Sequence, residues 1–121
     1  MNVLICGSRD WSDEYPIFEV LSEHYDPKRD LVIHGAARGA DMIADAVARR
    51  LGYTVMSFPA DWRGHGRAAG PIRNKLMLDT GRPDVVWAFK RDFDETLQRG
   101  GTENMVRIAR GAGVETWVVT E

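Results

Sequence analysis

Short apolar runs alternate with longer amphipathic segments along the whole chain. The runs are rich in valine and isoleucine, and they are bounded by turn residues. Because they are short, continuous and β-branched, they predict strands buried on both faces, as in a parallel sheet. The predicted strands are Val3–Cys6, Leu31–Ile33, Thr54–Phe58, Val85–Phe89 and Thr116–Val119.

The segments between these runs carry apolar residues at helical spacing. Ile17, Phe18 and Leu21 share one stripe of the first segment, and Gly52 follows the second segment as a helix C-cap would. We expect Trp87 and Trp117, which lie inside predicted strands, to be core residues. The predicted helices are Tyr15–Tyr25, Met42–Leu51, Pro71–Thr80 and Thr102–Arg110.

This alternation predicts a single α/β domain over residues 1–121, with a mostly parallel five-stranded sheet and helices on both faces. Right-handed crossovers favour a Rossmann-like, three-layer arrangement, and we expect the strand order 3-2-1-4-5. Ligands of such sheets bind outside the carboxyl ends of the strands, whatever the order.

Composition and charge narrow the functional classes. Apolar residues make up 44% of the chain and charged residues 28%, which is typical of a globular protein. The lone Cys6 lies in an apolar run, so we expect it to serve packing in a reducing, cytoplasmic compartment. No apolar run approaches the roughly 20 residues of a membrane helix, so no membrane partner is expected. The net charge of −2 disfavours broad non-specific DNA binding but leaves a local basic face open.

The chemically distinctive residues gather in the loops that leave strands. The loops that enter strands (DPKRD, GYT, TGRPD and GAGVE) hold turn residues and little else. The loops that leave strands concentrate arginine, glycine, histidine and aspartate: GSRDWSD, HGAARGAD, ADWRGHGRAAGPIRN and KRDFDETLQRGGTEN. One edge of the sheet is therefore the predicted site.

The residue types at this edge suit an anionic ligand. Glycine lets backbone N–H groups approach a ligand closely, and helix N-termini favour negative charge. Arginine adds bidentate recognition of phosphate. The chain has neither a Walker lysine nor a G-x-G-x-x-G motif. A phosphorylated or nucleotide-like ligand is the leading expectation.

Several of these residues also have a plain structural interpretation. His34 at a strand end can be a satisfied structural histidine, and Asp41 can be a first-turn acid favoured by the helix dipole. Trp62 can stack on a base or cover an edge of the core. His34, Asp41, Asp61 and His65 lack the dense spacing of metal ligands, so no metal site is expected.

The same loops resemble the SLOG superfamily, in particular its small YspA-like (YpsA-related) bacterial and phage proteins. The resemblance covers nearly the whole chain, in order: GSRDW, HGAARGAD, ADWRGHGRAAGPIRNKLML and GGTENMV. It implies a Rossmann-like sheet and a nucleotide or nucleotide-derived ligand, with no required cofactor. Relatives commonly pair, so a homodimer is expected, with Met42–Leu51 or Pro71–Leu78 as its surface.

Two branches of the superfamily imply different activities. HGAARGAD is similar to the DprA motif that binds single-stranded DNA, so single-stranded nucleic acid is an alternative partner. GGTENMV is similar to the motif of LOG phosphoribohydrolases, which release a base from a nucleoside monophosphate. Arg73 falls where the catalytic arginine of those enzymes would be, but the position of their glutamate is Met105 here.

That substitution weakens the hydrolase alternative. Cleavage of an N-glycosidic bond needs a carboxylate to stabilise an oxocarbenium-like transition state, and methionine supplies none. Glu103 lies two residues away, about 200° around a helix, and cannot simply replace it. Asp10, Asp41 or Asp61 would have to supply a carboxylate from another loop.

A ligand-binding module is therefore the main prediction, and a LOG-like hydrolase and a single-strand binder are the alternatives. Arg73 is the one catalytic candidate. The predicted ligand-binding residues are Gly7, Ser8, Arg9, Asp10, Trp11, His34, Gly35, Arg38, Gly39, Asp41, Asp61, Trp62, His65, Arg73, Asn74, Gly100, Gly101 and Thr102.

Overall fold

Five parallel strands form one open sheet. In the computed structural model, which describes residues 1–121, they are β1 (Asn2–Gly7), β2 (Leu31–His34), β3 (Thr54–Ser57), β4 (Val85–Phe89) and β5 (Glu115–Val119). They pair in the order β3-β2-β1-β4-β5, and every pair is parallel. The predicted Rossmann-like α/β fold with this strand order is confirmed.

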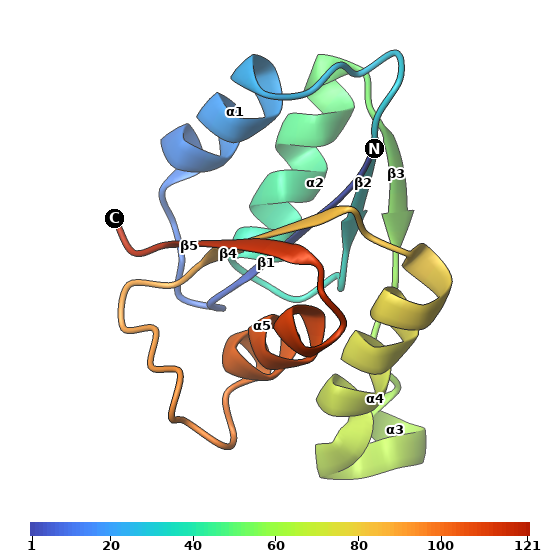
Figure 1. Cartoon of the computed structure of the whole chain (residues 1–121), viewed down its shortest axis with the longest axis vertical. Coiled ribbons are helices and arrows are strands. Elements are labelled where there is room, and N and C mark those ends of the chain that lie inside the picture. Colours follow the sequence, from blue (N-terminus) through green and yellow to red (C-terminus); the bar gives the residue numbers. More distant parts are fainter.

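Four main helices connect the strands: α1 (Glu14–Glu23), α2 (Ala40–Leu51), α4 (Ala69–Leu76) and α5 (Gly101–Gly111). The helices α1 and α2 cover one face of the sheet, and α4 and α5 cover the other (Figure 1). The connection from β3 to α4 holds a short helix, α3 (Trp62–His65), and a 3₁₀ turn, Gly66–Ala68. No helix has the length and apolar character needed to cross a bilayer.

Side chains of β1 alternate between two cores, one on each face of the sheet. Val3 and Ile5 join the core under α1 and α2, whereas Leu4 and Cys6 join the core under α4 and α5. All four are buried. This alternation is the period-2 pattern of a strand covered on both faces, as the continuous apolar run predicts.

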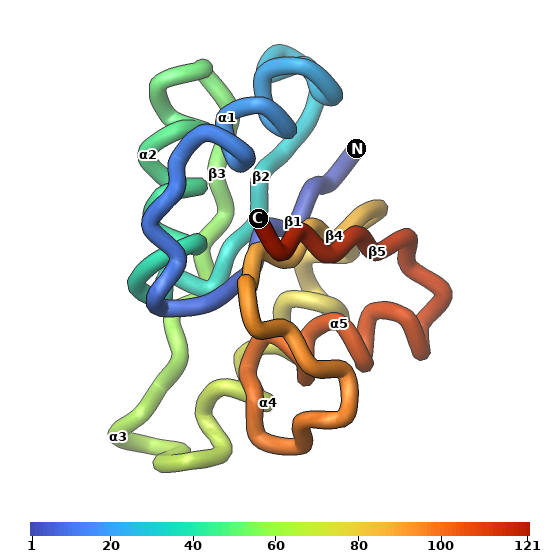
Figure 2. Tube along the Cα trace, turned by 90° about the vertical axis from the view of Figure 1, so that its left-hand side faces the viewer, coloured from blue at the N-terminus to red at the C-terminus, as the bar shows by residue number.

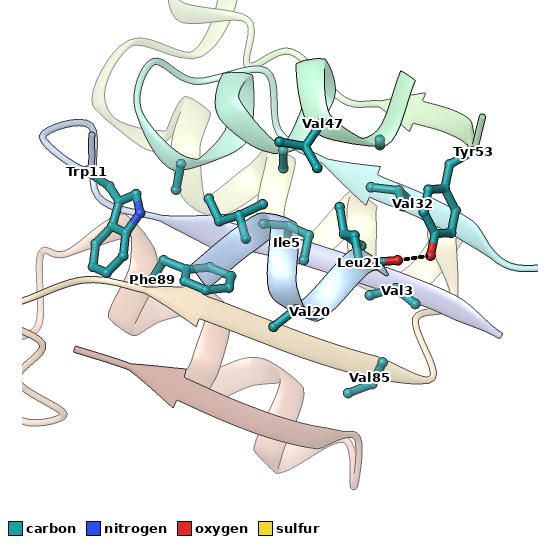
Figure 3. Packing of buried hydrophobic residues seen from close by; sticks show 14 residues of the cluster. Val3, Ile5, Trp11, Val20, Leu21, Val32, Val47, Tyr53, Val85 and Phe89 are labelled. Carbon is teal, nitrogen blue, oxygen red and sulfur yellow. Dashed lines mark hydrogen bonds between the residues drawn. The ribbon is translucent and has the colours of Figure 1, made fainter. Parts of the chain in front are cut away.

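The core under α1 and α2 contains three buried aromatic residues (Figure 3). The Trp11 ring meets Phe89 edge-to-face, with centroids 5.6 Å apart. At the other end, the Tyr53 hydroxyl donates a hydrogen bond to the carbonyl of Leu21. Tyr53 therefore buries its ring without leaving its hydroxyl unpaired.

The two edge strands differ from the prediction. In β3, Thr54, Met56 and Ser57 are exposed, so this strand is not covered on both faces. Trp117 on β5 is 51% exposed, so its predicted core position is wrong. It stacks instead on half-buried Trp87, with centroids 5.7 Å apart. The physical reason is position in the sheet, because an edge strand has a neighbour on one side only.

The helix after β3 also differs in extent. It was expected over Pro71–Thr80, but α4 begins at Ala69 and passes into a π-helical turn at Met77–Gly81. Pro71 is tolerated because it lies in the first turn, where an N–H has no intrahelical acceptor. The turns at Trp62–Ala68 escaped prediction because every residue in them is exposed and carries no apolar periodicity.

The loops that leave β1 and β2 meet at Gly39. This residue has φ +77°, and the next N–H, of Ala40, donates to the carbonyl of Ser8 at 3.2 Å. A Cβ at Gly39 would overlap that same carbonyl oxygen. Glycine is thus required both for the backbone conformation and for the close approach of the two loops.

We expect Gly39→Ala to destabilise the protein more than Gly52→Ala. Both glycines have positive φ, but the nearest atom to a Cβ at Gly52 is the Cβ of Pro27 at 4.0 Å. Gly52→Ala should therefore cost only the left-handed penalty, about 1–2 kcal/mol in the free energy of unfolding. Urea denaturation of both variants measures the difference. Equal losses would show that the contact with Ser8 does not constrain the loops.

Candidate functional site

A crevice opens at the carboxyl ends of the strands. Figure 2 shows α3 and the loop after β4 extending beyond the same end of the sheet. The crevice has two adjoining parts, a main chamber and a side chamber, each of about 340 Å³. They share Arg9, Ala37, Trp62 and Arg73 in their walls.

The fold brings many of the predicted residues to these two chambers. Gly35 and Arg38 line the side chamber. The predicted residues that line the main chamber are Gly7, Ser8, Arg9, Asp41, Trp62, Arg73, Asn74, Gly101 and Thr102. They come from loops or helix starts after all four of the first strands, as the rule for open parallel sheets implies.

Sequence reasoning missed three cations of the main chamber. Arg67, Lys90 and Arg99 line it together with the predicted residues. All three follow strands β3 or β4, so the concentration of basic residues in the strand-exit loops was the available signal. It did not show which of these side chains turn inward, because that depends on the path of long loops.

The remaining predicted residues line neither chamber: Asp10, Trp11, His34, Gly39, Asp61, His65 and Gly100. Trp11 is buried in the core, and its indole N–H donates to the carbonyl of Asp13. Asp61 caps α3 by accepting the N–H of Gly64, while Asp10 and His65 are exposed.

His34 is held on both ring nitrogens. Its Nδ1 accepts the N–H of Ala36 at 2.9 Å, and its Nε2 lies 2.8 Å from the Asp45 carboxylate. Because Nδ1 is an acceptor, the proton of the neutral ring lies on Nε2 and is donated to Asp45. The imidazole is 1% exposed. His34 therefore orders the loop after β2 instead of reaching the chambers.

The Asp41 side chain holds the HGAARGAD loop in place through hydrogen bonds to its backbone. One carboxylate oxygen accepts the N–H groups of Gly35 at 3.1 Å and Ala37 at 3.2 Å. Burial raises the pKa of Asp41, while these two N–H groups and the charge of Arg73 act in the opposite direction. The N–H groups of Gly35 and Ala37 are thus already engaged within the protein and are not free to bind a phosphate.

Arg73 is positioned by both neighbouring walls. One guanidinium nitrogen donates to the carbonyl of Gly35, and Nε donates to the Asn74 side chain at 2.9 Å. Burial lowers the pKa of Arg73 and Asp41 raises it, and the guanidinium stays charged at neutral pH. Its other terminal nitrogen has no acceptor in the protein, so it remains available to a ligand.

Asn74 is a connector and does not offer its amide to the crevice. The side-chain N–H₂ donates to the carbonyl of Gly101 at 3.0 Å and to the Asn104 side chain at 2.9 Å. Its oxygen accepts from Arg73. Asn74 therefore couples the position of Arg73 to the start of α5.

The start of α5 faces the main chamber. The N–H groups of a first helical turn have no intrahelical acceptor, and Gly101 and Thr102 supply two of them here. Thr102 is 7% exposed, and its hydroxyl makes no hydrogen bond within the protein. Every fully buried side-chain polar atom does have a partner, so this hydroxyl is open to the chamber.

Glu103 turns away from the chambers. Its fully buried carboxylate pairs with Lys90 at 2.9 Å and accepts the N–H of Asp94 at 3.1 Å. Burial alone would raise the pKa of Glu103, but these partners outweigh it and hold the pKa below its ordinary value. A Cβ at Gly100 would overlap this carboxylate, so the absence of a side chain at Gly100 leaves room for Glu103.

The main chamber is strongly cationic in a protein of net charge −2. Five basic side chains line it, and Asp41 is its only carboxylate. Arg9, Arg67 and Arg99 form no ion pair within the protein, so their charges are not neutralised by a neighbouring carboxylate. Unpaired arginines around a hollow of this size suit an anion with several oxygen atoms.

The described residues favour neither nucleophilic catalysis by a cysteine nor metal binding. Burial raises the pKa of the Cys6 thiol, which therefore stays protonated and is no nucleophile. Nowhere in residues 1–121 do three His, Cys, Asp or Glu side chains come close enough to hold a metal ion.

Comparison with known proteins shows the family of this chain. A model of the YspA, cpYpsA-related SLOG family matches residues 1–65, which carry the first three strands and the loops that leave β1 and β2. The Gene 61 protein of Mycobacterium phage D29 is 41% identical over 120 residues, covering 93% of this chain and 90% of that protein. The chain belongs to the YspA, cpYpsA-related SLOG family.

Proposed function

We propose that the crevice binds a nucleotide or a nucleotide-derived phosphorylated ligand. The observation that carries this proposal is the gathering of Arg9, Arg67 and Arg99, all without ion-pair partners, around the open first turn of α5. Membership of the SLOG family supports a ligand-binding Rossmann-like module in general. The charge pattern adds that the ligand is an anion.

Each wall of the main chamber would contribute a different kind of contact. The N–H groups at Gly101 and Thr102, together with the Thr102 hydroxyl, would donate to phosphate oxygens. Arg73 would use its free terminal nitrogen, already aimed by Gly35 and Asn74. Such preorganisation lowers the entropic cost of binding, since the side chain is ordered before the ligand arrives.

The LOG-like hydrolase alternative lacks the glutamate that its mechanism requires. Met105 is fully buried in the core under α4 and α5, so the position of the LOG glutamate does not face the crevice. Asp41 is the only carboxylate in the main chamber, and one of its oxygens already serves two loop N–H groups. We therefore propose binding, without base release through a residue of α5.

Two expectations about partners stay predictions. For the homodimer, α4 leaves Ile72 and Leu76 exposed by 44% and 50%, one helical turn apart, and α2 leaves Met42 exposed by 46%. Light scattering after gel filtration measures the mass in solution.

For single-stranded nucleic acid, affinity should fall steeply with salt because phosphate contacts release counterions.

Isothermal titration with nucleoside mono- and diphosphates, cyclic nucleotides and ADP-ribose should show saturable binding of at least one ligand. Arg73→Ala and Arg99→Ala should each weaken it about 10- to 100-fold, the worth of one charged hydrogen bond. Arg110→Ala should leave it unchanged, because Arg110 pairs with Glu95 outside both chambers. Absence of saturable binding by a correctly folded protein would contradict the proposal.

Met105→Glu should destabilise the fold without creating base release. A carboxyl group would enter a core position that is 0% exposed, at a cost of about 3 kcal/mol or more in the free energy of unfolding. Burial would raise the pKa of that carboxyl, so the penalty should shrink as the pH falls towards 4. Urea denaturation at several pH values measures it, with Met105→Leu as the control that preserves volume.

Unchanged stability of Met105→Glu at neutral pH would show that position 105 reaches solvent. Release of free base from a nucleoside monophosphate by this variant would favour the hydrolase alternative over binding alone.

A further inference from the structure

Trp62 is a large aromatic residue that packs in neither hydrophobic core. It lies in the short helix α3, is 49% exposed, and belongs to neither hydrophobic cluster. The Arg9 guanidinium lies over its ring, 5.4 Å from the centroid. Its indole N–H makes no hydrogen bond within the protein. Packing therefore does not explain why an indole stands here.

The indole stands at the border of the two chambers. Trp62 lines both, as do Arg9 and Arg73. The edge of its ring also approaches Gly70, 3.7 Å from where a Cβ would lie at that buried position in α4. The ring contacts Arg9 and borders both chambers, so it is available to a ligand that enters either one.

The side chamber differs from the main chamber in chemistry. Four of its nine lining residues are small and apolar, against three arginines: the apolar ones are Ala36, Ala37, Pro59 and Ala60, and the arginines are Arg9, Arg38 and Arg73. It includes neither the start of α5 nor any carboxylate. A phosphate would find fewer donors here than in the main chamber, whereas a flat ring would bury its faces against apolar surface. The two chambers therefore suit the two ends of one nucleotide.

We propose that Trp62 is the base-stacking residue, with the nucleobase in the side chamber and the phosphate in the main chamber. This inference rests on the proposed function and adds to it the orientation of the ligand and a requirement for an aromatic base. Stacking on an aromatic side chain strengthens the binding of different bases alike, because every base has a π-face. Arg9 and Arg73, at the border, would lie beside the ribose that links the base to the phosphate.

The test compares ligands with and without a base on variants with and without the indole. The ligands are AMP, GMP, CMP, UMP and ribose 5-phosphate, and the variants are Trp62→Ala and Trp62→Phe. Trp117→Ala is the matched control, because Trp117 is 51% exposed and lies on β5, outside both chambers. Titration calorimetry gives the affinities, and quenching of tryptophan fluorescence by the tightest monophosphate gives an independent signal.

We expect Trp62→Ala to weaken the tightest monophosphate about 10-fold or more. The affinity for ribose 5-phosphate should change less than about 2-fold. Trp62→Phe should retain most of the monophosphate affinity but lose the quenching. Trp117→Ala should change neither affinity.

Two results would overturn the inference and leave the proposed function standing. One is an unchanged monophosphate affinity in Trp62→Ala while Arg99→Ala still weakens binding. The other is an equal loss for monophosphate and ribose 5-phosphate, which would show that Trp62 acts only by placing Arg9. Failure of the unaltered protein to bind any of the five ligands, or any of the nucleoside diphosphates, cyclic nucleotides and ADP-ribose, would instead overturn the proposed function, and this inference with it.

Discussion

The arrangement of the site depends on one buried carboxylate, that of Asp41. By accepting the N–H groups of Gly35 and Ala37, it folds the loop after β2 back onto the first turn of α2. The carbonyl of Gly35 then faces Arg73, which donates to it from α4 on the other side of the sheet. A side chain from one strand exit thus sets the place of an arginine that follows another strand.

Further buried polar contacts extend this network to the remaining wall. Asn74 joins Arg73 to the start of α5, and the pair of Lys90 and Glu103 joins the end of β4 to the same helix. No fully buried side-chain polar atom lacks a partner. The network ends at the crevice, where Arg9, Arg67 and Arg99 are exposed and form no ion pair within the protein.

The candidate site could be predicted from the sequence only in outline. Ser8, Arg73 and Thr102 reach the main chamber as predicted, because each follows a strand whose carboxyl end meets the crevice. His34 and Trp11 follow strands in the same way, yet one is held by Asp45 and the other packs on Phe89. Position after a strand selects the edge of the sheet, whereas the direction of each side chain depends on partners that are distant in sequence.

By itself, the sequence determined the alternation of strands and helices, the parallel sheet and the edge of the sheet at which the candidate site lies. These follow from local periodicity and from chain connectivity, which need no knowledge of long-range contacts. Only the tertiary structure decided that Asp41 takes the loop amides and that Met105 is core. It also placed Trp117 at an exposed edge and Trp62 over the crevice. Burial and hydrogen-bond partners are properties of the assembled layers, so they appear only when strands and loops far apart in the sequence come together.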